Sequence, residues 1–390
     1  MSVTFPRGFL ASGTAAGIKA SGNPDMAIVA IDGTEPGVAA ATFTTNLSAA
    51  APVVVSRANL AQSGNLASAV LLTSGNANAA TGASGEAKAR ASVACLATEL
   101  KVPYEHVLVC STGLIGIPLP IDKVLAQIPG AVGELDGDEE AGLDAAKALM
   151  TTDTFAKIAK YEIDGARFGG IAKGAAMISP NMATMLAVIT TDAIVSQGVL
   201  AHALSRAVER SFNRITIDGC TSTNDTVIAI SSSASGVALS DAALYEGISA
   251  ICSSLASQIV FDAEGATKLI KVRATGAQSE ADALAVARKI AQSSLVKCSF
   301  FGMDPYWGRV ISEVGSSGVA VAMEEVSVSY GDLMVYSKTE ELEVNRDLLA
   351  QIMAAREIEL SVSLGSGDFE ATIITADLTP AYIAENMRTS

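Results

Sequence analysis

The sequence predicts an α/β protein with a large aliphatic core and more than one domain. Of its 390 residues, 49% are hydrophobic but only 5% are aromatic, so Ala, Val, Ile and Leu must form most of the core. Short apolar runs alternate with segments whose apolar residues recur at helical spacing. Because the tail has an α/β pattern of its own, we expect a catalytic domain at 1–294 and a smaller α/β domain at 295–390.

Apolar runs bounded by turn residues predict the strands. These runs cover residues 27–31, 37–43, 51–56, 69–73, 107–110, 161–163, 167–171, 186–189, 215–218, 226–231 and 267–274. In the tail, a Gly-rich junction at 301–318 precedes predicted strands at 326–330, 333–336, 357–364 and 370–375. The pair at 161–163 and 167–171 has the spacing of a hairpin.

Helical periodicity predicts the helices. They cover residues 84–100, 120–128, 143–150, 196–212, a long segment that begins at 240, 279–293 and 345–356. The helix that begins at Ser279 has the clearest start signal, because Ser279 can cap it while Glu280 and Asp282 lie in its first turn. The segment at 133–141 is acidic and is expected on the surface.

Charge and cysteine usage exclude several functions. The net charge of −15 and the pI near 4.6 oppose binding to nucleic acid or to anionic membranes. The five cysteines have no zinc-type spacing, which predicts no metal site, and their odd number favours a reducing compartment. The N-terminus lacks a signal pattern, and no apolar run approaches the ~18 residues of a membrane span. We therefore expect a cytoplasmic protein with no membrane partner.

A candidate nucleophile lies in the stretch 169–192, where Thr184 precedes the apolar run at 186–189. A threonine hydroxyl needs a base, and neither His106 nor His202 lies in a motif typical of catalysis. The α-amine of Thr184, if freed by cleavage after the small residue Ala183, would have a pKa of about 7.7–8.0, which suits a general base. From the residues alone, a buried strand threonine is the alternative interpretation.

Three further polar segments follow or precede apolar elements. Thr112 and Gly113 end a predicted strand and can offer a hydroxyl and a backbone N–H to an oxyanion. Hydroxyl, amide and carboxylate side chains are dense in 218–225, and Glu264 can bind an ammonium group. Lys173 and Glu264 together would suit an amino-acid substrate. Ordinary turns are the alternative for each segment, and the Gly-rich sequence around Lys173 lacks the spacing of a phosphate loop.

Seven segments, in order along nearly the whole chain, carry a family resemblance. They are 73–82, 111–116, 150–154, 172–174 with 180–185, 218–226, 264–268 and 301–309. On these motifs the chain resembles the ornithine acetyltransferases, also called bifunctional glutamate N-acetyltransferase/amino-acid acetyltransferase. The family usually has Asn where this chain has Tyr306, and its C-terminal tail is usually one residue longer.

The resemblance implies a layered αββα-type sandwich, similar to N-terminal-nucleophile hydrolases but differently connected, with a smaller C-terminal α/β domain. It also implies a precursor that cleaves itself between Ala183 and Thr184. The resulting α chain (1–183) and β chain (184–390) would stay associated, as an α2β2 heterotetramer or a larger assembly. No metal or organic cofactor is implied.

The resemblance further implies an acetyltransferase of arginine biosynthesis. Thr184 would accept the acetyl group of N-acetylornithine and pass it to glutamate by ping-pong kinetics. Thr112 and Gly113 would form the oxyanion hole. The implied substrate contacts are Thr151, Thr152, Lys173, Thr184, Glu264, Asn386 and Ser390. The sequence leaves open whether acetyl-CoA is also a donor.

Three other functions remain open at the level of sequence. A paralogue with the same threonine chemistry would act on other N-acetyl amino acids. An amidohydrolase or aminopeptidase would let water take the acyl group. A non-catalytic binding protein would need no cleavable bond, and the intact Ala183–Thr184 site therefore disfavours it.

Overall fold

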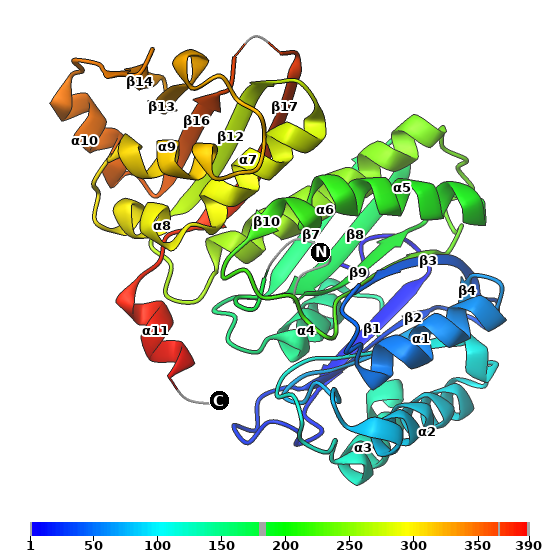
Figure 1. The fold of residues 1–390 in the computed structure, drawn as a ribbon. Helices are drawn as coiled ribbons and strands as arrows, with labels where there is room; N and C mark the ends of the chain where they lie inside the picture. Colours follow the sequence, from blue (N-terminus) through cyan, green and yellow to red (C-terminus); the bar gives the residue numbers. More distant parts are fainter. Residues whose placement is uncertain (1, 179–184, 366, 388–390) are drawn as a thin grey trace. The chain divides into compact units, whose positions relative to one another are not determined.

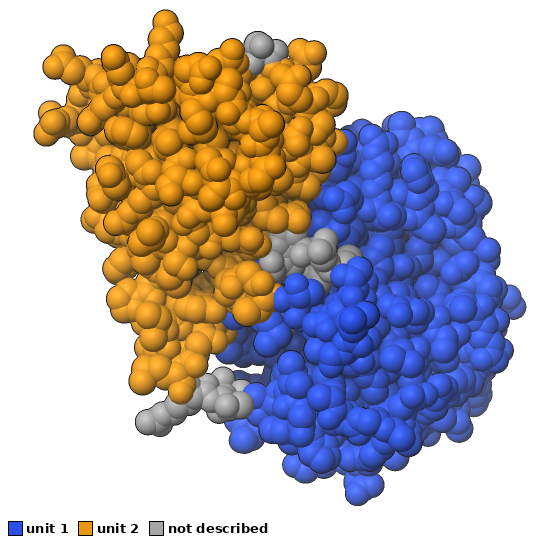
Figure 2. Space-filling model, in the orientation of Figure 1, with its two compact units in different colours: residues 1–213, 221–259, 390 blue, residues 214–220, 260–389 orange. Residues whose placement is uncertain are grey.

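The computed structural model describes residues 2–178, 185–365 and 367–387. The chain forms two compact units, coloured separately in Figure 2. Of the described residues, unit 1 holds those within 2–213 and 221–259, and unit 2 holds those within 214–220 and 260–387. This division differs from the predicted boundary after residue 294, because β12 (Leu269–Ala277) and α7 (Glu280–Gln292) pack with the C-terminal strands of unit 2.

The first sheet of unit 1 has the strand order β1-β2-β5-β6. Its strands are β1 (Phe9–Thr14), β2 (Met26–Ile31), β5 (Ala69–Thr73) and β6 (Val107–Ser111), and only the β5–β6 pair is parallel. The outer face packs against helices α1 (Ala51–Gln62), α2 (Gly82–Leu100) and α3 (Ile121–Gly133). Val55, Val93 and Val124 of these helices share one core with Ile28 and Leu71 of the sheet.

The second sheet of unit 1 has the order β4-β3-β11-β9-β8-β7. Its strands are β4 (Leu66–Ala67), β3 (Gly37–Phe43), β11 (Thr226–Ser231), β9 (Leu186–Thr191), β8 (Ala166–Lys173) and β7 (Lys157–Ile163). Helices α5 (Gln197–Arg210) and α6 (Asp241–Phe261) cover its outer face. Gly247 of α6 lies against the ring of Phe168, so the helix packs directly on β8.

The two sheets of unit 1 face each other across an aliphatic core (Figure 1). Val29 and Leu72 of the first sheet share this core with Val188 and Ile228 of the second, and α4 (Glu139–Leu149) packs against β1, β2 and β8. The central strands are buried on both faces, because successive side chains point alternately to this core and to the outer helices. The predicted αββα sandwich is confirmed.

Unit 2 is the smaller α/β unit, built on a sheet of order β10-β17-β12-β16-β13-β14-β15. Besides β12, its strands are β10 (Ile215–Thr216), β13 (Ser327–Tyr330), β14 (Leu333–Ser337), β15 (Glu340–Glu341), β16 (Glu357–Ser363) and β17 (Phe369–Ala376). Its helices are α7, α8 (Ser294–Phe301), α9 (Trp307–Gly315), α10 (Arg346–Ala354) and α11 (Pro380–Asn386). A short 3-10 turn lies at Met323–Glu325 in this unit; two others lie outside it or at its border, at Tyr104–His106 and Phe212–Arg214.

The predicted strand at 51–56 is wrong, because these residues begin helix α1. Pro52 lies in the first turn, where its fixed φ favours a helix start. Val55 packs into the core beneath the first sheet, so tertiary burial outweighs the β propensity of the valine run. Elements β1, β4 (Leu66–Ala67), β15 (Glu340–Glu341), α8, α9 and α11 were not predicted. In α9, Trp307 stacks on Tyr336 with ring centroids 4.4 Å apart, a contact that the local sequence does not show.

Helix α6 is long and apolar enough to cross a membrane by length and composition. Half of its most apolar window is nevertheless buried within the fold. Together with its packing on β8, this is the behaviour of a core helix, so its hydropathy is explained without a membrane.

Candidate active site

Five strand ends of unit 1 bring polar residues to one end of the sandwich. β8 runs antiparallel to both β7 and β9, while β9 and β11 are parallel. The C-terminal end of β8, at Lys173, therefore lies beside the N-terminal ends of β7, β9 and β11. The register pairs Lys173 with Leu186 and Leu186 with Thr226. Asn224 of the loop before β11 hydrogen-bonds to the end of β6, so all five ends meet.

The end of β6 presents the two predicted oxyanion residues. The Thr112 N–H already donates to Thr73 O at 2.9 Å, so the Thr112 donor available to a ligand is its hydroxyl. Gly113 is exposed, and its φ of +128° favours glycine. A Cβ on Gly113 would lie 2.3 Å from the carbonyl carbon of Gly75, so no other residue fits there. The pair can therefore offer one hydroxyl and one backbone N–H.

Asn224 fixes this end of β6 in place. Its Nδ2 donates to Ser111 O at 2.8 Å and to Ala77 O at 2.6 Å, and its Oδ1 accepts from the Thr223 hydroxyl. Asn224 is buried. One amide thus connects the loop before β11 with the residue before Thr112, so a change at Asn224 would disturb the oxyanion pair.

A buried ion pair organises the end of β8. Asp153 Oδ1 accepts from Lys157 Nζ at 2.5 Å and from Gly174 N at 2.8 Å, while its Oδ2 accepts from Thr151 N at 2.9 Å. Burial alone would raise the pKa of Asp153, but the charges of Lys157 and Lys173 and the Gly174 N–H hold it below its usual range. Asp153 is therefore an ionised carboxylate that connects the predicted substrate segment at Thr151 with the backbone beside Lys173.

A second buried carboxyl, Asp225, contacts Met185, the residue that follows the expected nucleophile in the sequence. Its Oδ1 accepts from the N–H of Met185 at 2.9 Å, and that nitrogen is bonded to the carbonyl carbon of residue 184. Burial raises the pKa of Asp225 well above its usual range, against the opposing effects of the Met185 N–H, Lys173 and the nearby Ser222 hydroxyl. Its Oδ2 is buried and makes no hydrogen bond of ordinary geometry among the described residues, although the Ser222 hydroxyl lies close enough to lower its pKa.

Other nucleophiles and bases fit this site poorly. Burial raises the pKa of the Cys110 thiol to about 12, so the one cysteine near the end of β6 stays protonated. His202 is exposed on α5, and His106 lies in the 3-10 turn that precedes β6, at the opposite end of that strand from Thr112. No group of potential metal-ligating side chains exists in the part of the chain that the structure describes.

Unit 2 brings together two predicted substrate contacts that lie far apart in the sequence. Asn386 Nδ2 donates to Glu264 Oε2 at 2.7 Å and to Tyr382 O at 2.9 Å. The Tyr382 hydroxyl donates to Asp218 Oδ2 at 3.3 Å. Burial, followed by the charge of Asp218, raises the pKa of the Tyr382 hydroxyl, which stays protonated. Helix α11 therefore holds Asn386 beside the Glu264 carboxylate.

The predicted site residues thus fall into three groups. Thr112, Gly113, Thr151 and Lys173 lie at or beside the end of the sandwich described above, and Thr152 is the exposed neighbour of Thr151. Glu264 and Asn386 lie together in unit 2. Ala183, Thr184 and Ser390 lie outside the described residues. Sequence reasoning missed Asp153, Lys157, Asn224 and Asp225 as site residues, although the last two belong to the polar segment 218–225, directly before β11.

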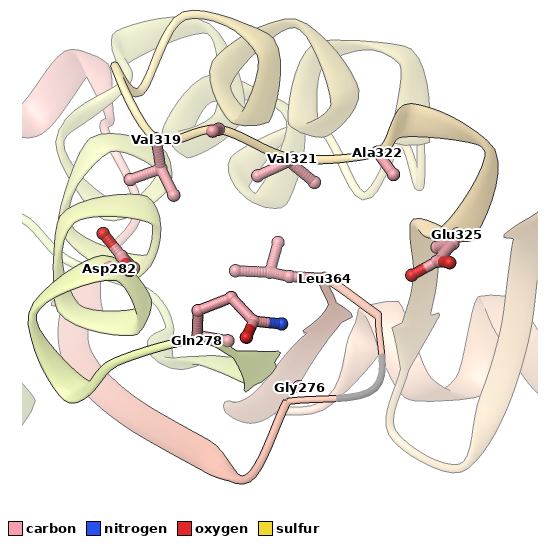
Figure 3. Close-up of a pocket in the computed structure, with 10 residues that line it drawn as sticks. Gly276, Gln278, Asp282, Val319, Val321, Ala322, Glu325 and Leu364 are labelled. Atoms are coloured by element: carbon pink, nitrogen blue, oxygen red, sulfur yellow. The ribbon is translucent and has the colours of Figure 1, made fainter.

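A depression of about 220 Å³ in unit 2 contains none of the predicted residues (Figure 3). Gln278, Val319, Val321 and Glu325 line it together with Asp282. The Asp282 side chain is already engaged at the start of α7, where it accepts from the Ser279 hydroxyl at 2.7 Å. We assign no ligand to this depression.

Comparison with known proteins identifies the family. The ArgJ family model matches residues 10–389. The arginine biosynthesis bifunctional protein ArgJ of Thermobifida fusca is 43% identical over 386 residues, covering 99% of both chains. That of Streptomyces avermitilis is 44% identical over 387 residues, with the same coverage. The chain belongs to the ArgJ family.

Two solved structures are similar to about half of this chain. A crystal structure of ornithine acetyltransferase from Mycobacterium tuberculosis, complexed with ornithine, is 38% identical, covers 46% of this chain and 94% of its own, and has a TM-score of 0.41. An ArgJ structure from Bacillus halodurans is 36% identical, covers 51% of this chain and 96% of its own, and has a TM-score of 0.49. Membership of the ArgJ family confirms the predicted function class, an acetyl-transferring enzyme of arginine biosynthesis that acts on small molecules.

Proposed function

We propose that this enzyme moves the acetyl group of N-acetylornithine to glutamate through an acetyl ester on Thr184. The observation that carries the proposal is the convergence of Thr112, Gly113, Lys173 and the Met185 N–H at one end of unit 1. This end supplies oxyanion donors, a cation for a substrate carboxylate and the residue that follows the nucleophile. The family membership and the ornithine named in the structure of the Mycobacterium tuberculosis relative support the same substrate class.

The first chemical step is cleavage of the chain between Ala183 and Thr184. The Thr184 hydroxyl attacks the Ala183 carbonyl carbon, the peptide nitrogen takes a proton as it leaves, and an ester forms. Water then hydrolyses the ester, which regenerates the hydroxyl and leaves the carboxylate on Ala183. The Thr184 nitrogen becomes a free α-amine that serves as the base for transfer.

Acetyl transfer follows the same chemistry on a substrate. The α-amine takes the proton of the Thr184 hydroxyl while its oxygen attacks the acetyl carbonyl, and the oxyanion is stabilised by the Thr112 hydroxyl and the Gly113 N–H. The amine of ornithine leaves with the proton. Glutamate then attacks the acetyl ester through its own amine, which restores free Thr184 and gives N-acetylglutamate.

Charged groups select the substrates in this proposal. Lys173, buried at the end of β8, provides a cation for the α-carboxylate that both substrates share. Thr151 and Thr152 add hydroxyls beside it. Glu264 and Asn386, which lie together in unit 2, remain proposed substrate contacts. Ser390 remains a proposed contact. The residues that we assign need no metal or organic cofactor, and acetyl-CoA remains a candidate second donor.

The same proposal extends to the assembly of the two cleaved chains and to their place in the cell. The α chain (1–183) and β chain (184–390) stay together because β8 and β9, on either side of the cleaved bond, are hydrogen-bonded neighbours in one sheet. We propose an α2β2 assembly in the cytoplasm.

Two measurements on purified protein test this function. Denaturing gel electrophoresis should show two chains, one of which begins at Thr184 by N-terminal sequencing. An acetyl-transfer assay should show N-acetylornithine as donor and glutamate as acceptor, with the parallel double-reciprocal plots of a ping-pong mechanism. Acetyl-CoA as donor is measured in the same assay. A single uncut chain, or hydrolysis of N-acetylornithine without transfer to glutamate, would contradict the proposal.

Replacement of Thr112 by Ala should lower kcat about 10²-fold or more, because it removes one of the two oxyanion donors. Thr112→Ser keeps the hydroxyl and should retain most of the rate. Steady-state kinetics with N-acetylornithine and glutamate measure both variants. A near-wild-type kcat in Thr112→Ala would mean that another residue donates the hydrogen bond to the oxyanion.

A further inference from the structure

The loop that joins β1 to β2 carries a lysine, Lys19, that the proposed reaction does not yet use. The register pairs Met26, at the start of β2, with Thr73, at the end of β5, and pairs Thr73 with Ser111, at the end of β6. The loop before β2 therefore lies at the same end of the first sheet as Thr112. This places Lys19 at the end of the sandwich that holds the candidate active site.

The aliphatic stem of Lys19 packs on the backbone beside the oxyanion pair. A Cβ built on Gly75 would lie 2.9 Å from Lys19 Cγ, and a Cβ built on Gly113 would lie 2.3 Å from the carbonyl carbon of Gly75. Gly75 therefore contacts both Lys19 and Gly113. A single glycine separates the lysine stem from the residue whose N–H is proposed to stabilise the oxyanion.

Asp25 fixes the backbone of this loop. It is fully buried, and its Oδ1 accepts from the Ala16 N–H at 2.6 Å. Its Oδ2 accepts from the N–H groups of Ile18 at 2.5 Å and Lys19 at 2.8 Å. Hydrogen bonds of this kind hold a loop through its backbone. The position of Lys19 is therefore set by its main chain, and its ammonium group is not needed for that purpose.

The Lys19 ammonium group has hydrogens left for a ligand. Its Nζ donates to Pro24 O at 2.7 Å and makes no other hydrogen bond or ion pair with the residues that the structure describes. An ammonium group has three hydrogens to donate, so two remain. Burial lowers the pKa of Lys19, while the charges of Asp25 and Asp153 raise it. The ammonium group therefore lies within the electrostatic influence of Asp153, the carboxylate at the end of β8.

Asp153 is already paired with another lysine. Its Oδ1 accepts from Lys157 Nζ at 2.5 Å, and the charge of Lys173 also lowers its pKa. Lys19 and Lys173 are thus two cations near the same carboxylate, and Lys157 is the lysine that pairs with it. A ligand with two carboxylates would suit such a pair of cations, since each carboxylate would accept charge-assisted hydrogen bonds.

We propose that Lys19 is a specificity-determining residue that binds the side-chain carboxylate of glutamate and of N-acetylglutamate, while Lys173 binds their α-carboxylate. Glutamate and N-acetylglutamate carry two carboxylates, whereas ornithine and N-acetylornithine carry one carboxylate and a side-chain amine. Lys19 therefore acts in the half-reaction of glutamate and has no anion to bind in that of ornithine. This inference rests on the proposed function, in which glutamate accepts the acetyl group.

Lys19→Met tests the charge, because methionine keeps an aliphatic stem on Gly75 and removes the ammonium group. In a ping-pong mechanism, kcat/KM for each substrate reports its own half-reaction. We expect kcat/KM for glutamate to fall about 10- to 100-fold, the usual effect of removing a charge-assisted hydrogen bond, while kcat/KM for N-acetylornithine stays within about twofold of wild type. In the reverse reaction, N-acetylglutamate as donor should lose the same factor and ornithine as acceptor should lose none.

Lys123→Met is the matched control. Lys123 is exposed on α3, and its Nζ donates to Gly17 O at 2.7 Å in the same loop as Lys19. The substitution removes a lysine charge and a hydrogen bond to this loop without removing a proposed carboxylate partner. All four values of kcat/KM should therefore stay within about twofold of wild type.

Two results with folded Lys19→Met would overturn the role of Lys19. One is an unchanged kcat/KM for glutamate. The other is an equal loss for glutamate and N-acetylornithine, because it would mean that Lys19 supports the backbone of Gly75 and Gly113 and does not select a substrate. If Lys19→Met does not fold, as judged by thermal melting, Lys19→Gln replaces it, since its amide can donate a hydrogen bond without a charge, and the same split between substrates is required. A wild-type enzyme that transfers no acetyl group to glutamate would contradict the proposed function itself.

Discussion

Thr184→Ala should yield a single uncut chain with no measurable acetyl transfer. The substitution removes the oxygen that attacks Ala183 in cleavage and the acetyl group in transfer, so both reactions lose their nucleophile at once. Loss of a nucleophile costs at least about 10⁴-fold in rate, below the detection limit of most transfer assays. Gel electrophoresis reads cleavage, and the N-acetylornithine–glutamate assay reads transfer.

Thr184→Ser tests the hydroxyl alone, because serine keeps the hydroxyl and lacks only the methyl group of threonine. It keeps the oxygen and, after cleavage, an α-amine, so it should still be cleaved and should retain part of the transfer rate. Thermal melting of both variants shows whether either substitution disturbs the fold. Transfer by an uncut, folded Thr184→Ala protein would assign the nucleophile to another residue.

Much of the fold could be predicted because burial and periodicity coincide along most of the chain. Strands β3, β5 and β11 have the predicted bounds, since each is an apolar run ended by turn residues. Helix α7 begins where Ser279 was expected to cap it, and the Ser279 side chain accepts from the Asp282 N–H. Helix α1 was mistaken for a strand because its valine run has strand propensity, and only the position of Val55 against the first sheet reveals the helix.

Only those site residues that belong to recognisable sequence motifs could be predicted. Thr112 and Gly113 directly follow strand β6, and Lys173 ends strand β8. Such residues can be found from sequence because they stand where an apolar run ends. Asp225 and Asn224 could be recognised only as part of a polar segment. Their roles depend on the parallel pairing of β9 with β11, which aligns Met185 with Asp225, and on an amide that reaches across to β6. Such pairings join residues far apart in the chain.

Asp153→Ala should lower the free energy of unfolding of the enzyme by about 3–5 kcal/mol, because it removes the carboxylate that neutralises the buried Lys157 ammonium. It should also lower activity, since Asp153 holds the backbone of Thr151 and Gly174 on either side of the proposed carboxylate-binding site. Denaturant unfolding followed by circular dichroism measures the first effect. The double variant Asp153→Ala/Lys157→Met removes both charges and should recover much of the lost stability.

The pH dependence of unfolding distinguishes this ion pair from a packing effect. The folded-state pKa of Asp153 lies below its usual value, so its stabilisation is fully present above the unfolded pKa of about 3.9 and is lost as pH falls through the folded pKa. We therefore expect the difference in unfolding free energy between wild type and Asp153→Ala to be constant from about pH 5 to 7 and to shrink below pH 4. A difference that stays constant into that acidic range would mean that Asp153 stabilises the fold by packing alone, without its charge.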